Sequence, residues 1–149
     1  MFNSIHYIIH IIPIILFLLI KAINPQSTLT ICIDGIRNDK GVIRLAFYHN
    51  NEEFQTDQPF RNETLDKDSM ANKSFCVQYS DLEPGIYGIA LLDDENENFQ
   101  MDYKLLIPEE GFGFSDLYPE ELKKPKFDDF KFQLDYCEKR ILIKIKYML

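Results

Sequence analysis

The stretch that decides the fold combines a turn, an apolar run and an acidic loop, and it reads Asp81-Leu82-Glu83-Pro84-Gly85-Ile86-Tyr87-Gly88-Ile89-Ala90-Leu91-Leu92-Asp93-Asp94-Glu95-Asn96-Glu97-Asn98. Pro84 and Gly85 mark a turn. The near-continuous apolar run at residues 86–92 predicts a central strand that is covered on both faces. A tyrosine directly after such a turn, here Tyr87, often ties the corner of a β-sandwich through its hydroxyl group.

Further strands are predicted on both sides of this stretch, because apolar and polar residues alternate with the period of a half-buried strand. They cover residues 28–36, 42–48, 74–82, 127–134 and 140–147. With the central strand these make six, and the polar segment between the second and third of them has room for a seventh strand or a helical turn. We expect residues 28–36 and 42–48 to form a hairpin, because turn residues join them.

Short alternating strands without a long amphipathic helix predict an all-β protein: an antiparallel β-sandwich, immunoglobulin-like or transthyretin-like, with about seven strands. The chain of 149 residues has the length of one domain, which we place at residues 28–149. If successive strands alternate in direction, the turns at 37–41 and 81–85 lie at one end of the sandwich. The loops at 50–73 and 93–126 then lie at the other end, where we expect any site.

The N-terminal segment is predicted to be a targeting signal rather than part of the fold. Residues 8–20 are nearly all aliphatic, and this run is shorter than the roughly 18–20 residues that a membrane-spanning helix needs. We therefore interpret residues 1–22 as the signal peptide of an exported protein that is periplasmic, extracellular or associated with the envelope. An uncleaved anchor stays open as an alternative, because no basic residue precedes the apolar run and no clear cleavage site follows it.

Composition excludes several classes of function. A formal net charge of −8 argues against a nucleic-acid partner and against a bare anionic membrane. Membrane association is expected only if the N-terminal segment is retained. The cysteines Cys32, Cys76 and Cys137 are too few for a disulfide framework, and their odd number leaves at least one thiol unpaired within the chain. Strand alternation places Cys32 and Cys76 on the face opposite the apolar residues.

Four motifs follow one another along the chain: Gly35-Ile36-Arg37-Asn38-Asp39-Lys40-Gly41, then Asp81-Leu82-Glu83-Pro84-Gly85-Ile86-Tyr87-Gly88-Ile89-Ala90, then Asp94-Glu95-Asn96-x-Asn98, then Pro108-Glu109-Glu110-Gly111-Phe112-Gly113-Phe114-Ser115. Together they resemble a bacterial family of exported proteins known as domain of unknown function 2141 (DUF2141). The resemblance covers residues 29–147. It implies an export signal, a single β-sandwich and no established activity. Family members typically read His-Asp-Glu-Asn-Gly-Asn-Gly in the acidic loop, where this chain has Asp93, Glu97 and Phe99 in place of the histidine and the two glycines.

The acidic loop is the first candidate site. Oxygen-bearing side chains recur at alternate positions in Asp94, Asn96 and Asn98, and Asp102 follows four residues later. This spacing is typical of loops that wrap a hard cation, so calcium is the candidate cofactor. An EF-hand is excluded, because Phe99 stands where its glycine is required and a leucine occupies the twelfth position. The alternative is a solvated acidic loop, which alternating Asp and Asn readily produce.

The second candidate site is the motif rich in glycine and phenylalanine. Phe112 and Phe114, with Glu110 beside them, could present a surface to a sugar or a peptide. The alternative is that both phenylalanines fold back and plug the open end of the sandwich. The partner expected here is a protein or a glycan of unknown identity.

No catalytic constellation stands out. His49 is the only imidazole outside the N-terminal segment, so a zinc site of several histidines or a Ser-His-Asp triad is hard to build. Adjacent surface carboxylates usually point apart, which weakens the case for a carboxylate-dependent hydrolase. The sequence therefore predicts a non-enzymatic binding or interaction module with a calcium-stabilised loop as a candidate feature. A structural envelope or spacer domain without a ligand site is the alternative.

Overall fold

The computed structural model describes residues 26–120 and 123–149, so the predicted signal segment at residues 1–22 lies outside the described part of the chain. Among the described residues, no helix has the length and apolarity needed to cross a membrane. The elements in chain order are β1 (Thr28–Asp34), β2 (Val42–Tyr48), α2 (Asn51–Gln55), β3 (Arg61–Asp66), β4 (Ser74–Tyr79), β5 (Gly85–Asp94), β6 (Tyr103–Lys104), β7 (Ile107–Pro108), β8 (Gly111–Phe114), α3 (Phe127–Phe130), β9 (Phe132–Leu134) and β10 (Glu138–Lys144).

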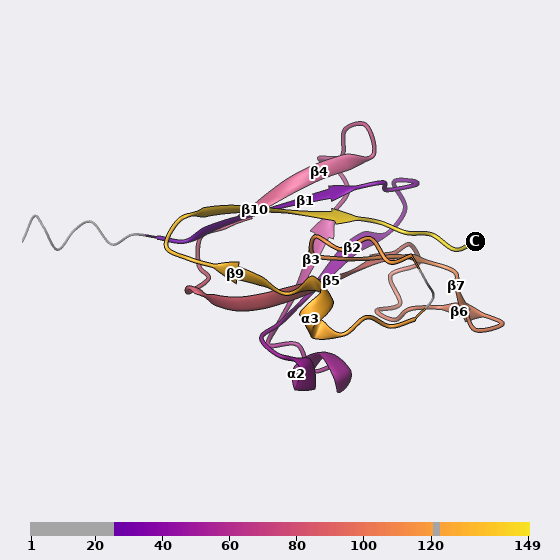
Figure 1. Ribbon diagram of the computed structural model, residues 1–149. Helices are drawn as coiled ribbons and strands as arrows, with labels where there is room; N and C mark the ends of the chain where they lie inside the picture. Colours follow the sequence, from indigo (N-terminus) through magenta and orange to yellow (C-terminus); the bar gives the residue numbers. More distant parts are fainter. Residues whose placement is uncertain (1–25, 121–122) are drawn as a thin grey trace, which may run out of the picture.

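The strands form two layers that face each other (Figure 1). The first sheet has the order β10-β1-β4, and the second has the order β3-β2-β5-β8, with β9 also pairing with β5. The strands β6 and β7 form a separate two-stranded hairpin. Every pairing is antiparallel except that of β1 with β10, which is parallel. The predicted all-β sandwich is therefore confirmed, with one parallel pair that the sequence did not indicate.

The main hydrophobic core lies between the two sheets, and a second apolar cluster covers the outer face of the second sheet beneath α2 and α3. Because both faces of β5 are covered in this way, its near-continuous apolar sequence is explained. The members of the second cluster are Tyr48, Phe54, Phe114, Phe127 and Phe130, with Ala46, Ala90, Phe112 and Leu117 packed against it.

The stretch around residue 84 behaves as predicted. The strand that follows the turn is β5, an interior strand of the second sheet. The hydroxyl group of Tyr87 donates a hydrogen bond to the carbonyl oxygen of Glu83 at 2.6 Å. This contact is the sandwich corner that the position of the tyrosine indicated.

The hairpin predicted from residues 28–36 and 42–48 is wrong. β1 belongs to the first sheet and β2 to the second, so the connection between them crosses the sandwich. Alternating apolar residues indicate which face of a strand is buried, but both sheets bury the same kind of face. The period therefore could not distinguish a paired neighbour from a strand in the facing sheet.

The predicted arrangement of the loops at the two ends is also wrong. Nε of Arg37 lies 2.5 Å from Oε1 of Glu95, so the turn at 37–41 shares its end with the loop after β5. At the other end, the ring of His49 lies 5.3 Å from that of Tyr87. The cause is β3, which lies inside the segment 50–73 and reverses the direction of every later strand.

The strand predicted at residues 127–134 is correct only in its second half. Phe127 and Phe130 lie three residues apart on the short helix α3, and β9 begins at Phe132. Both phenylalanines belong to the second apolar cluster, so their spacing follows the turn of a helix rather than the alternation of a strand.

Cys32 and Cys76 are directly opposite each other on β1 and β4 and form a disulfide. The sequence left the pairing open but placed both residues on the face away from the core, and that face is where they meet. Cys137 is free and exposed.

Candidate functional site

Two buried carboxylates hold the acidic loop that follows β5. The side chain of Asp94 accepts hydrogen bonds from the backbone N–H groups of Asn98 at 3.1 Å and Phe99 at 3.0 Å. The side chain of Glu110 accepts hydrogen bonds from the backbone N–H groups of Glu95 at 3.1 Å and of residue 102 at 3.4 Å. Both carboxylates are thus engaged with the backbone of the loop.

The surroundings of Glu110 change its pKa. Burial raises the pKa of the Glu110 carboxyl above its ordinary value, the two N–H donors oppose this effect, and the nearby carboxylates of Asp94 and Asp102 add to it. The structure therefore brings together Asp94, Asp102 and Glu110. Asp116 lies elsewhere, where its side chain accepts a hydrogen bond from the backbone N–H of Leu142 at 2.8 Å.

The four predicted calcium ligands lie in one loop, and they bind one another. The Nδ2 atoms of Asn96 and Asn98 both donate to Oδ2 of Asp102, at 2.6 Å and 2.9 Å. A cation beside Asp102 would need oxygen ligands around it, but the groups that these two asparagines turn toward Asp102 are amide nitrogens. Across residues 26–120 and 123–149, no group of three or more His, Cys, Asp or Glu side chains could hold a metal ion. These contacts are those of a loop closed by its own hydrogen bonds.

A buried ion pair lies behind the loop, and the sequence reasoning missed it. Oδ1 of Asp93 lies 2.5 Å from Nζ of Lys67, and both side chains are almost completely buried. The hydroxyl group of Tyr147 donates a further hydrogen bond to Asp93, and Lys67 donates one to the carbonyl oxygen of Lys40. Burial raises the pKa of Asp93, an effect that the contacts with Lys67 and Tyr147 oppose. The available signal was a lone lysine between Asp66 and Asp68.

Phe112 and Phe114 lie on the strand β8 rather than on a loop, and they point to the outer face of the second sheet. Gly111 and Gly113 alternate with them and face β10. A Cβ atom at Gly113 would lie 2.6 Å from Cγ2 of Ile143, so a larger residue would push the two strands apart. The phenylalanines consequently join the second apolar cluster and do not plug the core between the sheets.

Four rings at this second cluster, those of Tyr48, Phe54, Phe112 and Phe114, form the floor of a groove with a volume of about 380 Å³. Its walls are α2, the segment 123–125 and the hairpin β6–β7. The hydroxyl group of Tyr48 donates to Oδ1 of Asp57 at 3.0 Å, and Nζ of Lys124 donates to the carbonyl oxygen of Phe54 at 2.9 Å. The lining residues are Tyr48, Phe54, Asp57, Ala90, Leu91, Met101, Tyr103, Leu106, Pro108, Phe112, Phe114, Lys123, Lys124 and Pro125.

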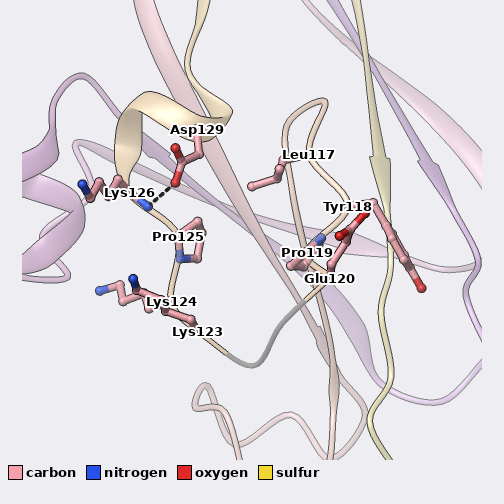
Figure 2. Close-up of a pocket in the computed structure, with 9 residues that line it drawn as sticks. All are labelled: Leu117, Tyr118, Pro119, Glu120, Lys123, Lys124, Pro125, Lys126 and Asp129. Atoms are coloured by element: carbon pink, nitrogen blue, oxygen red, sulfur yellow. Dashed lines mark hydrogen bonds between the residues drawn. The ribbon is translucent and has the colours of Figure 1, made fainter.

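A larger depression of about 600 Å³ is also lined by the segment 123–125. Figure 2 shows Lys123 and Lys124 on one side of the opening, and Tyr118 and Glu120 on the other. The charged residues that line it are all exposed. The groove has an aromatic floor and few polar groups, so it is the better candidate for a ligand.

The side chains of His49, Asp94 and Glu110 all have neighbours within the fold. The ring of His49 is stacked on that of Phe60 with centroids 3.7 Å apart, and its Nδ1 lies 3.6 Å from a carboxylate oxygen of Glu53. Asp94 and Glu110, the buried acids nearest the loop, already accept backbone hydrogen bonds.

Comparison with known proteins leaves the activity open. The model of the family described as "Uncharacterized protein conserved in bacteria (DUF2141)" matches residues 31–141. No curated protein and no solved structure matches the chain. Because the family carries no assigned activity, function has to be argued from the geometry of the molecule.

Proposed function

This chain belongs to the DUF2141 family of uncharacterized bacterial proteins, and from that premise we propose that it is an exported, non-enzymatic binding module whose ligand surface is the aromatic groove. The groove is the observation that carries the proposal. Its volume of about 380 Å³ and its mainly apolar lining fit the range of about 300–1,000 Å³ that is usual for ligand sites. Phe112 and Phe114 contribute to its floor, and Glu110 supports it indirectly through the acidic loop.

The acidic loop serves the groove as a support. Met101 lies within the loop and Tyr103 follows it directly, and both residues line the groove. A calcium ion coordinated by the loop would have to displace the amide contacts of Asn96 and Asn98 with Asp102. We therefore assign the loop a structural role, which its internal hydrogen bonds already fulfil.

Export is supported by the disulfide and by the N-terminal sequence. Disulfides persist mainly in oxidising compartments such as the periplasm and the cell exterior, and Cys32 and Cys76 are paired. The apolar segment at residues 8–20 has the length of a signal-peptide core.

The test is a titration followed by NMR on the protein purified from the envelope of a bacterial host. The two probes are a tetramer of N-acetylglucosamine and an uncharged apolar decapeptide, since a glycan and a protein segment are the two partners considered. We expect one probe to shift the ring resonances of Tyr48, Phe112 and Phe114. Tyr103→Ala should weaken that binding, whereas Tyr136→Ala, which removes an equally exposed tyrosine outside the groove, should not (62% and 59% exposed).

The alternative is a structural or spacer domain of the envelope without a ligand. It predicts that neither probe shifts any resonance of the groove at millimolar concentration. That result would end the proposal of a binding module.

A further inference from the structure

The tip of the hairpin β6–β7 exposes two leucines. Leu105 is 90% exposed and Leu106 is 91% exposed, although both are large apolar residues. Tyr103 pairs with Pro108 and Lys104 with Ile107, so the two leucines form the whole of a two-residue turn. Isolated exposed apolar residues are common on protein surfaces, but two adjacent leucines at this exposure form a small exposed apolar patch.

The backbone of these leucines is also unfavourable. Their φ angles are +50° and +68°, in the left-handed region. A two-residue hairpin turn with both central residues at positive φ strongly favours Asn-Gly, because Gly and Asn adopt this conformation at little cost. Each leucine is therefore strained here by comparison with a residue in relaxed backbone. Because the side chains are almost fully exposed, packing within the chain does not offset this strain.

The tip is continuous with the aromatic groove. Leu106 lines the groove together with Tyr103 and Pro108 of the same hairpin. Lys123 and Lys124 line the opposite wall, and Lys104 lies at the base of the tip. Asp57 also lines the groove, where it accepts a hydrogen bond from Tyr48. This surface is thus apolar with three lysines and one aspartate beside it, on a protein whose formal net charge is −8.

We propose that Leu105 and Leu106 are anchors with which the groove holds an extended, apolar segment of a partner protein that carries carboxylates beside its apolar side chains. The proposal rests on the binding role of the groove and specifies its partner. Charge complementarity argues for the carboxylates, since three lysines lie beside the apolar surface against one aspartate in the lining of the groove, on a molecule that is acidic as a whole. An extended segment can both follow a groove and cover a hairpin tip.

Two other occupants fit less well. A bilayer is planar, so it would reach the tip but not the concave floor of the groove, and an acidic protein is repelled by anionic lipid. Figure 1 also shows the hairpin β6–β7 at the end of the molecule opposite the start of β1, so an anchor preceding β1 would hold the tip away from its own membrane. A second copy of this chain would bring together two molecules that each carry a charge of −8.

The test compares the wild-type protein with the variant L105N/L106G. The probes are a decapeptide of alternating leucine and glutamate and the same peptide with lysine in place of glutamate. We expect the acidic peptide to bind the wild type at least about tenfold more tightly than the lysine peptide does. We also expect it to bind the wild type at least about tenfold more tightly than it binds the variant. Because Asn-Gly suits the turn, the variant should also unfold at a temperature a few degrees higher. Leu149→Asn, at another exposed leucine, should change neither property.

Each other outcome overturns the inference. A variant that unfolds at a lower temperature shows that the leucines stabilise the fold, and unchanged peptide affinity shows that they are not anchors. Equal binding of both peptides removes the charge argument. Binding to phosphatidylglycerol vesicles that is lost in the variant assigns the tip to a membrane instead. If Tyr103→Ala abolishes peptide binding but the tip variant does not, the groove keeps its proposed function and only the role of the tip is lost.

Discussion

Asp93 and Lys67 place opposite charges 2.5 Å apart in the interior, and this pair should respond asymmetrically to substitution. Asp93→Asn leaves the Lys67 ammonium buried without a counter-charge, so the free energy of unfolding should fall by about 3–5 kcal/mol. The double variant Asp93→Leu with Lys67→Met removes both charges and should be much closer to the wild type. Urea denaturation of the wild type and the two variants measures their free energies of unfolding. A double variant as unstable as the single one would contradict this account.

Single residues differed in how far the sequence revealed them. Tyr87 was predictable because its role depends on a local turn, and Pro84-Gly85 identified that turn. Asp93 was not, because nothing local distinguishes a buried aspartate at the end of an apolar strand from the first residue of an acidic loop. Its partners, Lys67 and Tyr147, come from distant segments that only the fold brings together.

At the level of elements, the loop after β5 provides a test of the calcium hypothesis. Its side chains are already occupied by hydrogen bonds within the loop. We therefore expect the protein to have the same unfolding midpoint in millimolar calcium as in the presence of a chelator. Binding of an ion to the folded state must raise the midpoint by mass action. A clear rise with calcium that is absent in Asp102→Asn would therefore establish a cation site formed by Asp94, Asn96, Asn98 and Asp102.

The strands themselves were largely predictable, and their partners were not. Alternation located β1, β2, β4 and β10, each of which buries one face, and a near-continuous apolar run located β5, which buries both. It could not assign β1 and β2 to different sheets, because both sheets bury the same kind of surface. The candidate site shows the same limit: Phe112 and Phe114 were recognised, but the groove also needs Tyr48, Phe54 and the hairpin β6–β7, which lie apart in the sequence.

For the whole molecule, burial of carboxyl groups predicts how stability depends on pH. Burial raises the pKa of both Asp93 and Glu110. Between the ordinary carboxyl pKa of about 4 and these higher values, the folded protein binds more protons than the unfolded chain, so stability falls as pH rises. Burial tends to raise the pKa of Glu95, but the hydrogen bond from Arg37 opposes this effect and the pKa is lowered. A lowered pKa changes stability only at pH values below the ordinary carboxyl pKa.

We therefore expect the unfolding midpoint to be higher at pH 5 than at pH 7. Glu110→Gln cannot titrate at this position, so the difference between the two pH values should be smaller in that variant, whatever its stability at either one. Thermal unfolding monitored by circular dichroism measures both proteins. An unchanged difference would show that Glu110 does not contribute to the pH dependence.

The parallel pairing of β1 with β10 also determines when the molecule can fold. β1 is the centre of the first sheet, and one of its two neighbours is β10, which lies far from it along the chain. Contacts between strands so far apart in sequence form slowly, because the loop between them must close first. The first sheet is therefore incomplete until β10 has been synthesised. A nascent chain of this kind therefore stays incompletely folded from the synthesis of β1 to that of β10.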